Sequence, residues 1–165
     1  MSILVRRISI AKWGDISTES SDVPADAITN CLKTSNNSLS VWAIESEDDL
    51  NDVILALVTG KSQEKFSKID FVLIDEWKLK TFGLQVIDYP GDTVVDELVN
   101  HHKNISGLTY NKLGIMKDII RECIICGQHN MRTRERIKKL VKSSIESGKL
   151  QKEKLNEKLI ASEKL

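Results

Sequence analysis

The chain has few of the residues that would place it in a specialised class of protein. Its 165 residues include 2 prolines, 3 cysteines and 5% aromatic residues. An odd, small number of cysteines in a chain of this length does not suit a disulfide-stapled secreted protein, so Cys31, Cys123 and Cys126 are expected to be reduced thiols. No apolar run approaches the roughly 20 residues of a membrane span, and the first residues lack the apolar region of a signal peptide. We therefore expect a cytoplasmic protein with no membrane association.

The overall composition is that of an ordinary globular protein, with 41% hydrophobic and 29% charged residues. The length fits one domain, because single domains typically run to about 100 to 150 residues. The formal net charge is zero, yet residues 1–100 carry 9 Lys and Arg against 17 Asp and Glu, a balance of −8, and residues 101–165 carry 15 against 7, a balance of +8. This asymmetry predicts either that the basic part lies against its own acidic part or that the two parts offer faces of opposite sign to partners.

The first part of the chain alternates between strand and helix patterns. Runs rich in β-branched or apolar residues predict strands over residues 3–10, 39–44, 69–74 and 84–89. A short helix is predicted to begin at Pro24, because proline favours the first position of a helix and an apolar stripe follows. The alternation predicts an α/β fold with a small mixed or mainly parallel sheet of about four strands, flanked by helices.

A second helix, over residues 48–59, has the clearest local signal. Ser46 supplies a capping side chain, and Glu47, Asp48 and Asp49 place negative charge where the helix dipole favours it. Apolar residues follow at helical spacing, and Gly60 stands where a helix commonly ends.

The part of the chain after Thr93 has its apolar residues at helical spacing throughout. We therefore expect a C-terminal helical subdomain, with a boundary near Gly91. The predicted organisation is an α/β domain over residues 1–91 and a basic helical region over residues 92–165, packed on the first.

One tripeptide suggests a possible metal-dependent reaction. Glu76, Trp77 and Lys78 follow a predicted core strand that is bounded by Asp70 and Asp75. In metal-dependent nucleases two carboxylates hold Mg²⁺ while a lysine orients or activates the attacking water. Such a tripeptide also arises by chance in a highly charged chain, so the favoured interpretation is a set of polar residues at a strand exit, with the catalytic interpretation as an alternative.

Cys123 and Cys126 have the spacing of a zinc-ligand pair, and His129 follows them closely. There is no second cysteine pair, and Cys123 lies on the apolar stripe of its predicted helix, where a free cysteine behaves as a small buried hydrophobe. We therefore expect no metal and no other cofactor, with zinc at these three residues as the alternative.

A strongly basic helix is the main candidate for a binding surface. Its apolar face is formed by Ile137, Leu140 and Val141, and its other face carries a single acid, Glu135. The candidate binding residues are Arg132, Arg134, Arg136, Lys138, Lys139 and Lys142. Such a helix can dock on phosphate backbones or on an acidic protein surface. Because it has no aromatic residue for base stacking, nucleic-acid binding is the alternative to protein binding.

Taken together, these patterns favour a binding protein over an enzyme, because no nucleophile elbow, zincin motif or dinucleotide fingerprint occurs in the chain. The leading hypothesis is an interaction protein, a bacterial-type accessory, immunity or regulatory factor that binds a protein partner through charged surfaces. The alternatives are nucleic-acid binding by the basic helix and a nuclease-like metal-dependent hydrolase. The sequence leaves the oligomeric state open.

Overall fold

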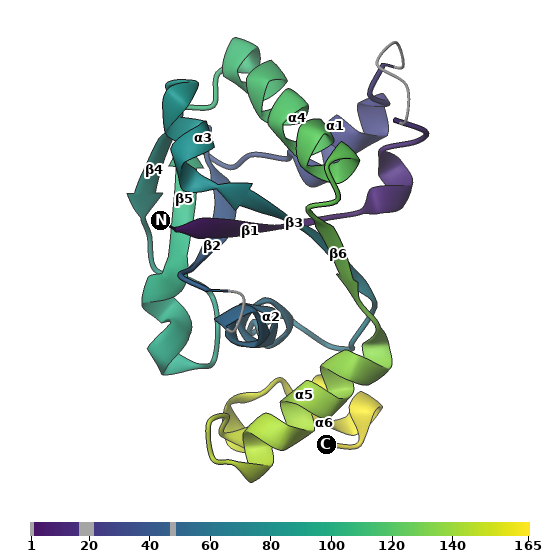
Figure 1. The fold of residues 1–165 in the computed structure, drawn as a ribbon. Coiled ribbons are helices and arrows are strands. Elements are labelled where there is room, and N and C mark those ends of the chain that lie inside the picture. The colour runs from purple at the N-terminus through teal and green to yellow at the C-terminus, as the bar shows by residue number, and fades with distance from the viewer. Residues whose placement is uncertain (1, 17–21, 47–48) are drawn as a thin grey trace.

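The computed structural model describes residues 2–16, 22–46 and 49–165, and its centre is one β-sheet (Figure 1). The strands are β1 (Ile3–Ile8), β2 (Leu39–Ile44), β3 (Ile69–Asp75), β4 (Gln85–Asp88), β5 (His102–Ser106) and β6 (His129–Arg132). Their order across the sheet is β4-β5-β2-β1-β3-β6. All five neighbouring pairs are antiparallel.

Helices cover both faces of this sheet. The α-helices are α1 (Ala25–Cys31), α2 (Leu50–Val58), α3 (Glu76–Thr81), α4 (Tyr110–Ile125), α5 (Arg134–Glu146) and α6 (Glu157–Glu163). The 3-10 helices are η1 (Ile10–Lys12), η3 (Asp96–His101) and η4 (Lys152–Lys154). In Figure 1, α1, α3 and α4 lie above the sheet, and α2, α5 and α6 lie below it. No helix within these described ranges is both long enough and apolar enough to cross a bilayer.

The predicted α/β class is confirmed, but the predicted sheet of about four mainly parallel strands is wrong. The sheet has six strands and is antiparallel throughout. Parallel strands are joined by a crossover that returns the chain to the starting end of the first strand, usually by way of a helix. Helix α1 has 7 residues, which span roughly 10 Å at 1.5 Å per residue, whereas the 6 residues of β1 span about 20 Å. So short a helix covers only about half of the return path, and the chain enters β2 antiparallel to β1.

The predicted C-terminal helical subdomain is also wrong, because two strands come from that part of the chain. Strand β5 pairs with β2 and β4, and β6 pairs with β3. The segment after Thr93 was expected to form a helix, but it forms η3 followed by β5. The division at residue 91 stays a prediction, and the sheet contains residues from both sides of it.

Two apolar clusters lie on opposite faces of the sheet. Along β1, Leu4 packs into the cluster that includes α1 and α4, and Val5 packs into the cluster that includes α2, α5 and α6. Both side chains are fully buried. The alternation follows from the strand period of two, and it explains why central strands read as nearly continuous apolar runs.

The helix predicted over residues 48–59 is confirmed as α2. Its cap differs from the expectation, because the Asp49 carboxylate accepts hydrogen bonds from the Ser46 backbone at 2.9 Å and from the Ser46 hydroxyl at 3.1 Å. These hydrogen bonds lower the pKa of Asp49. Glu47 and Asp48, which were expected to contribute to the same turn, lie outside the described residues.

Candidate functional site

The basic helix expected to bind a partner is α5, but it holds only five of the six candidate cations, because Arg132 is the last residue of β6. Two of the five are bound within the molecule. Arg134 donates to the carboxylate of Glu163 at 2.9 Å, and Lys138 Nζ lies 3.9 Å from the same carboxylate. The Glu163 side chain is fully buried and also accepts a hydrogen bond from the Phe66 backbone N–H at 2.9 Å. Arg134 and Lys138 therefore join α5 to α6.

Part of the charge asymmetry is neutralised by ion pairs between the two parts of the chain. Three lysines of the C-terminal part form ion pairs with acids of the acidic part: Lys149 with Asp52 at 2.5 Å, Lys154 with Asp96 at 2.6 Å and Lys158 with Glu64 at 2.6 Å. Each pair is solvent-accessible, so each contributes at most about 1 kcal/mol to stability. Of the two interpretations of the charge asymmetry, these pairs support the one in which the basic part lies against the acidic part.

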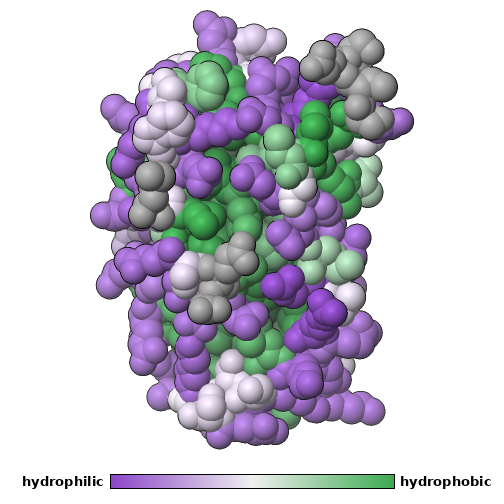
Figure 2. Space-filling model, viewed as in Figure 1, coloured by the Kyte–Doolittle hydropathy of each residue, from purple (hydrophilic) through white to green (hydrophobic). Residues whose placement is uncertain are grey.

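The remaining candidate cations form a free cationic row, defined as Arg132, Arg136, Lys139 and Lys142. None of the four has an acidic partner in the part of the chain that the structure describes. The guanidinium of Arg132 lies 5.6 Å from the centre of the Phe71 ring, and the other three side chains are exposed. Figure 2 shows hydrophilic side chains over most of the lower part of the molecule, where α5 lies.

The four residues of the nuclease alternative do not converge. Asp70 and Asp75 lie five residues apart on β3, so they face opposite sides of the sheet roughly 17 Å apart. Glu76 pairs with Lys80 at 2.7 Å, and Lys78 pairs with Glu122 of α4. Glu76 and Lys78 are thus each paired with another residue, and Asp70 and Asp75 lie too far apart on opposite faces of the sheet to hold one metal ion.

The zinc alternative also lacks a cluster of ligands. Cys123 is buried in α4, and burial raises the pKa of its thiol to about 11. Cys126 is exposed, and His129 lies on β6 with its Nε2 3.6 Å from Asp70 Oδ1. Within residues 2–16, 22–46 and 49–165, no three His, Cys, Asp or Glu side chains are placed to hold one metal ion.

A different surface, at the edge of the sheet formed by α3 and β4, stands out for its exposed apolar residues. Four of the seven large exposed hydrophobic residues among those described fall within residues 77–89. They are Trp77 (63% exposed), Phe82 (49%), Ile87 (45%) and Tyr89 (55%). We call this surface the β4 edge. Val86 packs on the face of the sheet that carries α3, so Ile87 and Tyr89 lie on the opposite face and the four side chains flank β4 from both sides. Exposed apolar side chains beside a strand edge are typical of a protein interaction site.

The backbone of β4 has one unpaired side. The Tyr89 N–H donates to the His102 carbonyl, so Tyr89 and His102 form a hydrogen-bonded pair of the antiparallel ladder. Such pairs alternate with non-hydrogen-bonded ones, and the N–H and C=O groups of Val86 and Asp88 therefore point away from β5. Nothing in the described part of the chain bonds to the N–H groups of Val86 and Asp88. In Figure 1, β4 is the outermost strand on the left.

The surroundings of the β4 edge are acidic. Residues 75–97 contain six Asp and Glu against two Lys, a balance of −4. The side chains of Asp75, Asp92 and Glu97 are exposed and have no basic partner among the residues described. The edge therefore combines apolar side chains, free backbone groups and a negative rim.

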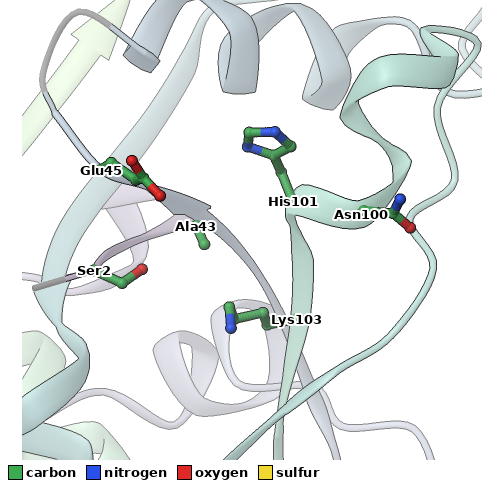
Figure 3. Close-up of a pocket in the computed structure, with 6 residues that line it drawn as sticks. All are labelled: Ser2, Ala43, Glu45, Asn100, His101 and Lys103. Carbon is green, nitrogen blue, oxygen red and sulfur yellow. The ribbon is translucent and has the colours of Figure 1, made fainter.

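Two pockets lie at the start of β5, and the smaller one adjoins the β4 edge. The larger, of about 660 Å³, is lined by Ser2, Ala43, Glu45, Asn100, His101 and Lys103. Figure 3 shows Glu45 and Lys103 extending into it from opposite sides, while Asn100 points outward. The smaller, of about 390 Å³, contains Tyr89 and His102 in its wall and shares Asn100 and Lys103 with the first. Lys103, which lines both pockets, is paired with Asp88 of β4 at 2.8 Å, and only the smaller pocket includes residues of β4 in its wall.

His102 has hydrogen-bond partners that the sequence did not reveal. Its Nε2 contacts the Ser40 hydroxyl, and its Nδ1 lies 2.9 Å from the Tyr89 carbonyl oxygen. The pattern of apolar residues predicted that His102 lies on a helix. The sequence therefore did not predict that His102 belongs to a strand beside β2 and β4. No signal in the local sequence marks Ser40, since its partner is 62 residues away.

The comparisons with known proteins do not assign the chain. No family model matches the sequence, and neither a curated protein nor a solved structure shows significant similarity to it.

Proposed function

We propose that this chain is an interaction protein, an accessory, immunity or regulatory factor, that binds a protein partner at the β4 edge. The observation that carries the proposal is the concentration of exposed apolar side chains beside unpaired backbone groups of β4. A free strand edge can accept an extended segment of another protein as an additional strand, with affinity from main-chain hydrogen bonds and specificity from alternate side chains.

The partner segment is expected to be extended, apolar at alternate positions and flanked by Lys or Arg. Ile87 and Tyr89 project from one face of β4, whereas Trp77 and Phe82 belong to α3 and the turn that follows it. These side chains favour aliphatic or aromatic contacts. The balance of −4 over residues 75–97 favours a cationic segment, and it disfavours nucleic acid at this edge.

The sharpest test is the substitution Asp88→Pro. Proline removes the N–H of residue 88, which points away from β5, and is tolerated on edge strands where that N–H is not used in the ladder. The β4 to β5 hydrogen bonds of residues 85, 87 and 89 remain. The fold should therefore survive while strand addition is weakened, which circular dichroism and a binding assay measure separately.

A photo-crosslinking amino acid identifies the surface directly. Placed at position 87 in cells of the native host, it should give a specific protein adduct that disappears in the Asp88→Pro background. Tyr110 is the matched control position, because it is 92% exposed and aromatic but belongs to α4. Equal adducts from positions 87 and 110, or adducts that persist with Asp88→Pro, would contradict docking at the β4 edge.

The free cationic row supports a second candidate function, nucleic-acid binding by α5. Three of its four side chains are exposed and, with Arg132, they face no acid among the described residues. Binding through them should weaken steeply with salt, because phosphate contacts release condensed counterions. The row is smaller than the six cations suggested by the sequence, since Arg134 and Lys138 are occupied by Glu163.

A further inference from the structure

Ser40 and His102 form a hydrogen-bonded pair of side chains on neighbouring strands. Ser40 lies on β2 directly opposite Asn104 of β5, and His102 lies opposite Trp42. The Ser40 hydroxyl contacts His102 Nε2, and His102 Nδ1 lies 2.9 Å from the Tyr89 carbonyl. A nucleophile, a base and a group that orients the base are thus joined in one chain of hydrogen bonds.

The Tyr89 carbonyl determines which nitrogen of His102 carries the proton. A carbonyl oxygen only accepts hydrogen bonds, so Nδ1 must be protonated and donate to it. In the neutral imidazole, Nε2 then has its lone pair free and accepts the hydrogen bond of the Ser40 hydroxyl. This is the tautomer that a general base needs in order to remove a proton from serine.

The surroundings favour a neutral imidazole and an accessible hydroxyl. His102 is 7% exposed and lies between Trp42, at a ring distance of 5.1 Å, and Tyr89, at 6.1 Å. Burial lowers the pKa of His102, and the hydrogen bond to Tyr89 offsets this in part. Ser40 is exposed. Its backbone is held by the buried guanidinium of Arg6, which donates to the Ser40 carbonyl at 2.7 Å.

We propose that Ser40 is a nucleophile and His102 its general base, in a site that cleaves short-chain carboxylic esters. The Ser40 oxygen bonds to the ester carbonyl carbon while its proton passes to His102 Nε2. The tetrahedral intermediate then collapses, the carbon–oxygen bond to the alcohol breaks, and the alcohol leaves with the proton from Nε2. Water attacks the acyl-serine by the same proton transfers, which releases the carboxylic acid and restores Ser40.

Asn104 is placed to stabilise the negative oxygen of the intermediate. Ser40 and Asn104 form a non-hydrogen-bonded pair of the ladder, in which the Cα atoms are about 4.5 Å apart and side chains approach closely. Within the described residues, the Asn104 side-chain amide has no hydrogen-bond partner, so it is free to donate to an oxyanion. Ile87 pairs with Asn104 across the next ladder and is 45% exposed, so it offers an apolar contact for a short acyl chain.

A fluorophosphonate probe tests the nucleophile without a known substrate. Attack by Ser40 forms an oxygen–phosphorus bond and expels fluoride, and mass spectrometry locates the adduct. The expected result is one adduct at Ser40, which is absent from Ser40→Ala and retained in Ser106→Ala. Ser106 is the matched control, because it lies on β5 on the same face of the sheet as Ser40. No adduct on the folded protein, or an adduct that persists in Ser40→Ala, would overturn the proposal.

Hydrolysis of p-nitrophenyl acetate tests the base and the oxyanion donor. In a Cys126→Ser background, which removes the exposed thiol, His102→Gln should lower the rate by about 100-fold or more, as should Asn104→Ala. His101→Gln, at the exposed neighbouring histidine, should leave the rate unchanged. The Ser40-dependent rate should rise with pH through the lowered pKa of His102, with the midpoint of the rise below pH 6.5.

A Ser40-dependent rate that is equal in His102→Gln and in the unmodified chain would refute the general base. If His102→Gln does not fold, the pH profile of the unmodified chain tests the general base instead. A Ser40-dependent rate that rises only above pH 8 would then refute the role of His102. Because Asp88→Pro leaves the Ser40 pair in place, the esterase and the docking surface can fail independently.

Discussion

The buried carboxylate of Glu163 allows a quantitative test of how the C-terminal segment is held. Replacing Glu163 with Gln keeps the volume of the side chain and the acceptor for the Phe66 N–H, but it removes the negative charge opposite Arg134 and Lys138. Breaking a buried ion pair costs about 3 to 5 kcal/mol. Arg134 is 52% exposed and can be rehydrated, so we expect a loss of about 2 kcal/mol for Glu163→Gln.

Glu163→Ala should cost more than Glu163→Gln, about 3 kcal/mol, because it also leaves the buried Phe66 N–H without an acceptor. Urea unfolding followed by circular dichroism measures both free energies. The control is Glu157→Gln, which removes an exposed carboxylate without an ion-pair partner among the described residues from the same helix and should change stability by less than about 0.5 kcal/mol.

The pH dependence gives a second check on the same interaction. Burial tends to raise the pKa of Glu163, but the hydrogen bond from Phe66 and the charges of Arg134 and Lys138 lower it below its ordinary 4.5. The carboxylate therefore stabilises the fold above pH 4.5, and this contribution is lost as the pH falls through the lowered value. The difference in the free energy of unfolding between the unmodified chain and Glu163→Gln should therefore decrease as the pH falls over that range. Equal unfolding free energies at pH 7 would refute the reasoning.

Three further predictions concern other parts of the molecule. At pH 8 only one of the three thiols, Cys126, should react rapidly with a disulfide reagent, and the two buried thiols should react only in denaturant. Gly91→Ala should destabilise the fold by about 1 to 3 kcal/mol in thermal unfolding, because its Cβ would lie 2.5 Å from Trp42 and 2.8 Å from His102. Substituting Ala for all four residues of the free cationic row should reduce the salt dependence of any binding to a fluorescent oligonucleotide, measured by anisotropy; an unchanged slope would exclude α5 as the contact surface.

The sequence predicts the central strands well, because their patterns are local. β1, β2 and β3 contain β-branched and apolar residues on both faces, so short apolar runs reveal them. Strands β5 and β6 have the sequences His-Lys-Asn-Ile-Ser and His-Asn-Met-Arg, which are poor in β-branched residues. Their strand conformation depends on pairing with β2 and β3, and a window of local sequence does not contain that information.

The candidate surfaces were predictable only where they depend on one element. The amphipathic basic helix is visible in the periodicity around Ile137 and Val141, and its position in α5 is confirmed. The occupation of Arg134 by Glu163 was not predictable, because it joins residues 29 positions apart. The same holds for Ser40 and His102, whose contact depends on the register between β2 and β5.

The strand order has a consequence for how the chain reaches its folded state. β1 lies inside the sheet between β2 and β3, and the edge strand β6 pairs with β3 across more than 50 residues of intervening chain. Ladders that join distant segments slow folding, because the intervening chain must be closed before the pairing is gained. Refolding is therefore expected to take milliseconds to seconds, roughly as for other domains rich in non-local pairings. Until β3 pairs with it, β1 presents an open apolar edge, and this is the stage at which molecules of the chain are most prone to aggregate.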